Sequence, residues 1–105
     1  MITVNSETNS MKAHKIKRAV ITWRKNPGNL SNAIFAAYHY ANRDNRIMYI
    51  AKGNSYMHRV YHIVKSLERA FDYCDTLGNV KEIFSVDVDG IVKKLLVQKG
   101  DIDEA

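Results

Sequence analysis

Residues 52–71, KGNSYMHRVYHIVKSLERAF, decide how the chain is expected to fold. The first four of them, residues 52–55, have the composition of a turn. Beyond the turn, apolar side chains recur at the spacing of one helix face, at Met57, Val60, Tyr61, Val64, Leu67 and Phe71. This pattern predicts a long amphipathic helix that begins directly after the turn.

Three further segments precede this turn and helix. Residues 19–23, AVITW, are β-branched and aromatic, which predicts a strand. After a basic turn at residues 24–28, Asn29 or Ser31 can cap a helix. Its apolar positions have helical spacing and are Leu30, Ile34, Ala37, Tyr38 and Ala41. Residues 47–51, IMYIA, are a short apolar run that predicts a buried central strand.

The C-terminal third of the sequence predicts a hairpin. Residues 80–88 and 91–97 are rich in apolar and β-branched side chains, and the Asp89-Gly90 pair between them is a strong turn signal. The expected order is therefore strand-helix-strand-helix-strand-strand. Such an order predicts an α/β (α+β) fold, with two helices on one face of a mixed four-stranded sheet.

Length and composition indicate one globular domain. A chain of 105 residues with 46% apolar residues is long enough for one core and too short for two. We expect a flexible tail at residues 1–11, the domain at residues 12–100 and an acidic tail at residues 101–105.

The cysteine and histidine residues do not have the spacing of a metal or cofactor site. Cys74 is the only cysteine, which excludes an internal disulfide, and there is no CxxC motif. His58 and His62 are four residues apart but lack an HExxH arrangement and an evident third ligand. We expect no structural metal and no cofactor. No apolar run reaches the roughly 18 residues of a membrane span, and no secretory signal is evident, so we expect an intracellular protein.

Positive charge is concentrated in the first two thirds of the chain. Residues 11–69 contain twelve Lys and Arg against two acids, whereas residues 70–105 contain four Lys against eight acids. The net charge is +5. A basic region of this kind is expected on a surface that meets phosphates, because each neutralised phosphate releases condensed counterions. A solvated surface without a ligand is the alternative interpretation.

Several short motifs occur in a collinear order. Residues 29–34, NLSNAI, with Ala36-Ala37 after them, begin one predicted helix, and residues 54–59, NSYMHR, begin the other. Together with the strand at residues 47–50 between them, these motifs resemble the Alba family of DNA- and RNA-binding proteins. The resemblance covers residues 29–71 and implies the strand-helix order given above.

Two positions depart from the family pattern. Asn54 stands where the family usually has glycine, and Asn enters the left-handed backbone region more readily than most residues. Tyr56 replaces a small alanine. The hairpin at Asp89-Gly90 is acidic where the family often has a basic arm, which favours RNA slightly over DNA as the ligand.

The resemblance implies that the loop after the first strand contacts nucleic acid, and Arg24 and Lys25 occupy that loop here. A second candidate cluster consists of Lys52, Gly53, Asn54, Ser55 and Arg59, with Tyr56 beside it as an aromatic side chain able to stack on a base. A turn that opens a helix presents free backbone N–H groups to an anion. A plain strand-to-helix connection is the alternative for this cluster.

The sequence thus predicts a binding protein and not an enzyme. We expect largely sequence-independent contacts with RNA or duplex DNA phosphates, made by a homodimer or by a heterodimer with a related Alba-like chain. Roles as a chromatin protein and as a subunit of an RNA–protein complex are both open. Two other classes also remain: a small nuclease or hydrolase with His58 or His62 as general base, and an adaptor for an acidic protein.

Overall fold

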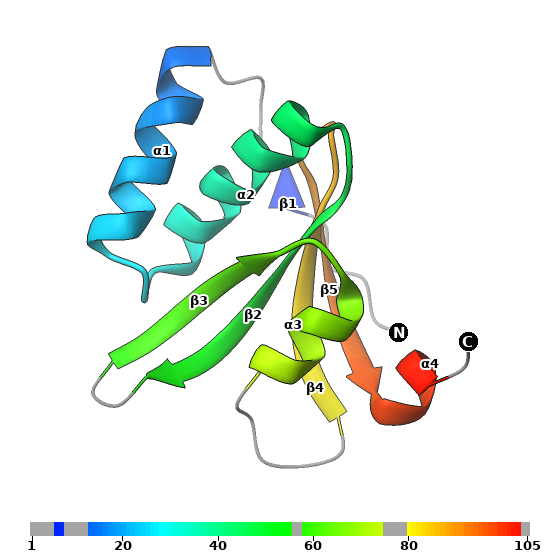
Figure 1. Ribbon diagram of the computed structural model, residues 1–105. Helices are drawn as coiled ribbons and strands as arrows, with labels where there is room; N and C mark the ends of the chain where they lie inside the picture. The colour runs from blue at the N-terminus through cyan, green and yellow to red at the C-terminus, as the bar shows by residue number, and fades with distance from the viewer. Residues whose placement is uncertain (1–5, 8–12, 56–57, 75–79, 104–105) are drawn as a thin grey trace.

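The computed structural model describes residues 6–7, 13–55, 58–74 and 80–103 (Figure 1). The elements in chain order are β1 (Ser6–Glu7), α1 (Ala13–Lys25), α2 (Leu30–Asp44), β2 (Met48–Ser55), β3 (His58–Val64), α3 (Leu67–Tyr73), β4 (Val80–Val86), β5 (Ile91–Gln98) and α4 (Lys99–Asp103).

The strands form one sheet in the order β1-β5-β4-β2-β3, and each pairing between described residues is antiparallel. The two residues of β1 extend a core of four longer strands. The mixed α+β class is therefore confirmed, whereas the predicted mixed sheet is wrong. Both β2–β3 and β4–β5 are hairpins, which place neighbouring strands antiparallel. β3 lies at one edge of the sheet.

Helices cover both faces of this sheet, so the prediction of two helices on one face is also wrong. Ile50 of β2 packs in a core cluster with Ala37 of α2, and the next residue, Ala51, packs in a second cluster with Ala70 of α3. Adjacent strand residues point to opposite faces. Accordingly α1 and α2 lie on one side of the sheet and α3 on the other (Figure 1).

The helix predicted from Leu30 is confirmed as α2, and local signals explain both of its ends. The Asn29 side chain accepts a hydrogen bond from the Asn32 backbone N–H at 3.0 Å, which caps the first turn. Asn45 ends the helix in the left-handed conformation with φ 50°. Small side chains on the buried side allow close packing against neighbours, and they are Ala33, Ala36, Ala37 and Ala41.

The predicted hairpin is confirmed as β4 and β5. Gly90 adopts φ 81°, a value that favours glycine. The Asp87 carboxylate accepts hydrogen bonds from the backbone N–H groups of Asp89 and Ile91, both at 2.9 Å. The turn is thus stabilised by its own side chain.

Residues 19–23 belong to α1, so the strand predicted there is wrong. Val20 is buried, and Trp23 packs against the core cluster to which α2 contributes. The helical spacing of these two residues therefore buries the apolar surface of both. The Thr22 hydroxyl donates to the Arg18 carbonyl at 2.9 Å, a bond that accommodates a β-branched residue in a helix. Tertiary packing overrides strand propensity here.

The long helix predicted after residue 55 is wrong. Residues 52–55 continue β2, the chain then returns as β3, and only residues 67–73 are helical. Tyr61 and Ile63 pack toward α2, and Val64 packs on the α3 face. Because helices cover both faces of β3, its sequence does not alternate between apolar and polar residues as a half-exposed strand does. Ser66 then caps α3 by accepting a hydrogen bond from the Arg69 N–H at 3.1 Å.

The two ends of the sequence, for which tails are predicted, contain ordered residues. Glu7 pairs with Ile91 in the sheet, and the Asp101 carboxylate in α4 accepts a hydrogen bond from the Gln98 N–H at 2.9 Å. Residues 1–5, 8–12 and 104–105 lie outside the described residues.

Gly53 of β2 allows a histidine ring to lie directly against the sheet. A Cβ atom at this position would stand 2.7 Å from Nε2 of His62 and 3.1 Å from the carbonyl oxygen of Tyr73. Both distances are too short for an ordinary contact. The absence of a side chain at Gly53 therefore sets the positions of His62 and of the end of α3.

We expect Gly53→Ala to lower the free energy of unfolding by about 1–2 kcal/mol, the usual cost of an overpacked site. This corresponds to a fall in Tm of about 5–10 °C, measured by circular dichroism. Gly100→Ala is the matched control, because a Cβ atom at Gly100 in α4 would meet no other atom within 4 Å. Equal Tm values for the two variants would contradict the proposed close approach at Gly53.

Candidate nucleic-acid interface

Two hydrogen bonds join the end of α1 and the turn that follows it to the edge strand β3. The Tyr61 backbone N–H donates to the Pro27 carbonyl at 2.7 Å, and the Trp23 indole N–H donates to the Tyr61 carbonyl at 3.1 Å. We call these two bonds the edge clamp. The clamp holds the Trp23 side chain beside the edge of the sheet, although α1 and β3 are far apart in the sequence.

Among the described residues, none pairs with the outer edge of the strand two residues beyond the clamp. The N–H and C=O groups of Tyr61 point away from β2, and in an antiparallel ladder every second residue directs its backbone groups the same way. Ile63 therefore directs its own N–H and C=O toward the free edge. We call the strand edge at Ile63 the open segment of β3. It lies between two cavities, and Ile63 lines both of them.

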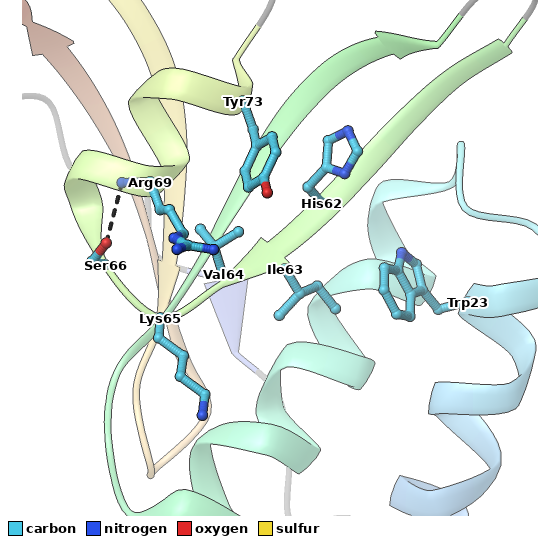
Figure 2. A pocket seen from close by; sticks show the side chains of 8 residues that line it. All are labelled: Trp23, His62, Ile63, Val64, Lys65, Ser66, Arg69 and Tyr73. Carbon is cyan, nitrogen blue, oxygen red and sulfur yellow. Dashed lines mark hydrogen bonds between the residues drawn. The ribbon is translucent and has the colours of Figure 1, made fainter.

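The first cavity, which we call the aromatic cavity, has a volume of about 640 Å³. Its lining residues are Trp23, His62, Ile63, Val64, Lys65, Ser66, Arg69 and Tyr73. Tyr73 and Arg69 extend from α3 and Trp23 from α1, with the end of β3 between them (Figure 2). The His62 and Tyr73 rings stack with centroids 5.1 Å apart and an interplanar angle of 23°.

The second cavity, which we call the arginine cavity, has a volume of about 350 Å³. Its lining residues are Trp23, Arg24, Tyr40, Arg43, Asp44, Met48, Ile63 and Lys65. The Arg24 guanidinium donates to the Tyr40 hydroxyl at 3.5 Å, and the Arg43 guanidinium carbon lies 4.8 Å from the centre of the Tyr40 ring. Because the cavities share Trp23, Ile63 and Lys65, we treat them together as the basic groove.

Local structure fixes the backbone that carries the cationic residues at the end of β3. The Arg46 guanidinium donates to the Lys65 carbonyl at 2.6 Å, which ties the turn after β3 to the end of α2. Ser66 caps α3, and Arg69 follows three residues later on the first turn of that helix. Lys65 and Arg69 are thus both exposed beside the open segment of β3.

Asp44 is the one carboxylate among the described residues that line the basic groove. Arg43 donates two hydrogen bonds to it, at 3.0 and 3.1 Å, and the Lys65 ammonium lies 3.9 Å away. The hydrogen bonds from Arg43 lower the pKa of Asp44, and the charges of Arg43, Lys65 and Arg46 act in the same direction. Asp44 therefore stays ionised and offsets part of the positive charge of the groove.

The predicted binding residues are only partly brought together. Arg24 lines the arginine cavity, and Lys25 is exposed at the last position of α1. Lys52 and Gly53 lie within β2, opposite Tyr61 and Val60, so they do not open a helix. The argument from free N–H groups at a helix start therefore fails for this segment.

The other members of the second candidate cluster lie at the far end of the same hairpin. Asn54 and Ser55 are the last residues of β2, and Arg59 pairs with Asn54 from β3. Tyr56 lies outside the described residues. The cluster is therefore part of an extended hairpin, and its members Lys52 and Gly53 are not among the described residues that line either cavity.

Sequence reasoning misses most of the residues that line the aromatic cavity. The apolar spacing places Lys65, Arg69 and Tyr73 on or beside one continuous helix with His62, and it places Trp23 on a strand. A usable signal is present, since the only tryptophan adjoins a basic pair and Lys65-Ser66 interrupts an apolar run before Arg69. Basic residues interleaved with aromatic ones are typical of nucleic-acid-binding surfaces.

Cys74, the only cysteine, lies at the end of α3. It is buried in the core, with its Sγ 3.8 Å from the Glu82 carbonyl oxygen, so the thiol packs as an apolar side chain. Within the described part of the chain, no group of three His, Cys, Asp or Glu side chains could hold a metal ion. In the same residues, no helix is long and apolar enough to cross a membrane.

Comparison with known proteins adds no relative. The chain matches no protein-family model, and neither a curated protein nor a solved structure is significantly similar to it. The fold is an α+β arrangement with helices on both faces of an antiparallel sheet, which differs from the element order implied by the Alba resemblance. Membership of that family stays a prediction.

We expect the pKa of Asp44 to rise toward its ordinary value in Arg43→Gln, and to rise less in Lys65→Gln. The reason is that Arg43 donates directly to the carboxylate, whereas Lys65 acts from 3.9 Å. Because the folded-state pKa is lowered, the ion pair persists above the pKa of the unfolded chain and is lost as the pH falls through the folded value. A carboxyl-detected NMR titration measures both shifts, and the reverse order would contradict the geometry.

Proposed function

We propose that this protein binds nucleic acid through the basic groove, by contacts with phosphates that depend little on sequence. The observation that carries this proposal is the convergence of Arg24, Arg43, Lys65 and Arg69 around Trp23 at the open edge of β3. These cations come from different elements, and Asp44 is the one carboxylate that lines the groove with them. Such a surface attracts a polyanion along its length.

Two features favour a nucleic acid over a small anion. The two adjoining cavities present cations on both sides of Ile63, so a ligand with repeated negative charges satisfies more of them than a single phosphate does. Aromatic side chains stand between the cations, at Trp23, Tyr40 and Tyr73. Rings provide stacking surfaces for bases, and every base has a face to stack.

The proposal specifies a binding protein with RNA or DNA as its partner and is independent of Alba membership. The expectation that two chains pair, as a homodimer or with a related chain, also stays a prediction. A nuclease is the alternative from another class. Among the described lining residues of the groove, His62 is the one with an imidazole side chain. A hydrolase would need a second group to exchange a proton with it.

Lys65→Ala with Arg69→Ala should weaken binding of RNA and DNA oligonucleotides strongly, because two phosphate contacts are lost. The slope of log K against log salt should become less steep by about 0.7 for each contact with a single strand. Fluorescence anisotropy with labelled oligonucleotides at several salt concentrations measures both quantities. RNA that stays full length after incubation with the wild-type protein excludes the nuclease alternative.

Lys93→Ala with Lys99→Ala is the matched control for this experiment. It removes the same charge from a chain of net charge +5, but from β5 and α4, which are separated from β3 by β4 and β2. We expect a much smaller loss of affinity. Equal losses for the two double variants would mean that net charge, and not the groove, determines binding.

Asp44→Asn should tighten binding, because it removes the one carboxylate that lines the groove and releases Arg43 and Lys65 for phosphates. We expect a gain of about threefold to tenfold at low salt, because solvent partly screens the charge that is removed. Glu82→Gln is the control, since Glu82 pairs with Lys94 at 3.2 Å outside the groove. An unchanged or weaker affinity of Asp44→Asn would argue against phosphates near Asp44.

A further inference from the structure

The aromatic cavity has features that phosphate binding alone does not require. We infer that it holds one unpaired nucleobase of a single-stranded RNA or DNA segment, while Lys65 and Arg69 bind the flanking phosphates. This inference rests on the proposed function and adds the form of the ligand to it. It is carried by three observations, which concern the rings, the strand edge and the position of the cations.

The rings form a stacking surface. Tyr73 is 45% exposed, and it is the one aromatic residue among the strongly exposed large hydrophobic residues that the structure describes. Its ring is held nearly parallel to His62, which in turn lies against Gly53. Trp23 is fixed on the opposite side of the cavity by the edge clamp (Figure 2). The cavity thus has a fixed ring on each of two sides, and the exposed Tyr73 ring is suited to stacking on a base.

The strand edge offers partners for the edge of a base. The N–H and C=O groups of Ile63 point toward the free side of β3, on the lining of the same cavity. One donor and one acceptor side by side can pair with the donor and acceptor groups on a base edge. In a duplex those base edges pair with the other strand, and the base faces are covered by neighbouring pairs, so the ligand must be single-stranded.

The cations lie where the backbone of such a strand would run. Lys65 and Arg69 are both exposed, they line the cavity that holds the rings, and Lys65 is shared with the arginine cavity. A base in the aromatic cavity therefore has a cation beside it, and the next phosphates meet Arg24 and Arg43. Charge complementarity alone would also fit an acidic peptide that adds a strand to β3. The stacked rings favour the base, because carboxylates gain nothing from a ring face.

Trp23 supplies a direct readout, because it is the only tryptophan in the chain and lines the cavity. The experiment titrates the wild-type protein with a labelled single-stranded oligothymidine, an abasic deoxyribose-phosphate strand of equal length, a duplex of equal length and poly-glutamate. We expect oligothymidine to quench Trp23 emission and to bind about tenfold more tightly than the abasic strand. The abasic strand and the duplex should bind without this quenching.

Tyr73→Ala tests the stacking surface without touching a charge. We expect this variant to lose about tenfold in affinity for oligothymidine and to bind the abasic strand within about twofold of the wild type. Tyr73→Phe should retain wild-type affinity, because stacking uses the ring and not the hydroxyl. Ile91→Ala, which removes an apolar side chain of similar exposure on β5, is the control and should change neither affinity.

The outcomes separate this inference from the proposed function. Equal affinity for oligothymidine and the abasic strand, with unchanged Trp23 emission, would overturn the base site and leave phosphate binding by the groove intact. Absence of binding to every nucleic acid at low salt would overturn both proposals. Binding of poly-glutamate as tight as that of oligothymidine would overturn the base site in favour of an acidic peptide.

Discussion

The edge clamp is the contact on which the rest of the site depends. The Pro27 carbonyl and the Trp23 indole N–H together satisfy both backbone groups of Tyr61 on an edge strand. Without these bonds, α1 and α2 would touch the sheet only through side chains. With them, the helical hairpin has a fixed position on β3, and the cavities between the hairpin, the strand and α3 have defined walls. An indole and a proline carbonyl thus convert an exposed sheet edge into a groove.

A second constraint positions the opposite wall. Gly53 has no side chain, so the His62 ring can lie on the sheet and the Tyr73 ring can stack on it. The two walls therefore originate on different elements, and α2 and α3 pack on opposite faces of the sheet beside β3. On the charged side, Arg46 ties the turn after β3 to α2. The positions of the rings and of the cations in the groove therefore both depend on the register of β3 with β2.

The parts of the fold that can be predicted from sequence are those with local signals. Asn29 caps α2 and Gly90 supplies the positive φ of the hairpin, and neither depends on distant residues. Residues 58–64 fit both a helix and a strand pattern, and the decision comes from α2 and α3, which cover the two faces of β3. Arg24 can be predicted as a candidate because it is a basic residue beside a local turn signal. Lys65, Arg69 and Tyr73 are missed because the sequence pattern assigns that region to a helix that does not form.

The proline in the edge clamp also limits how the sheet can grow. Proline has a carbonyl but no N–H, so the clamp satisfies Tyr61 without presenting a new row of donors to another chain. At Tyr61 a neighbouring molecule would find a ring and a closed turn in place of a template for a further strand, whereas the edge at Ile63 stays accessible to a ligand. Edge-to-edge pairing of two copies would thereby be confined to the short segment beyond the clamp, and so short a template favours aggregation less than a full open strand does.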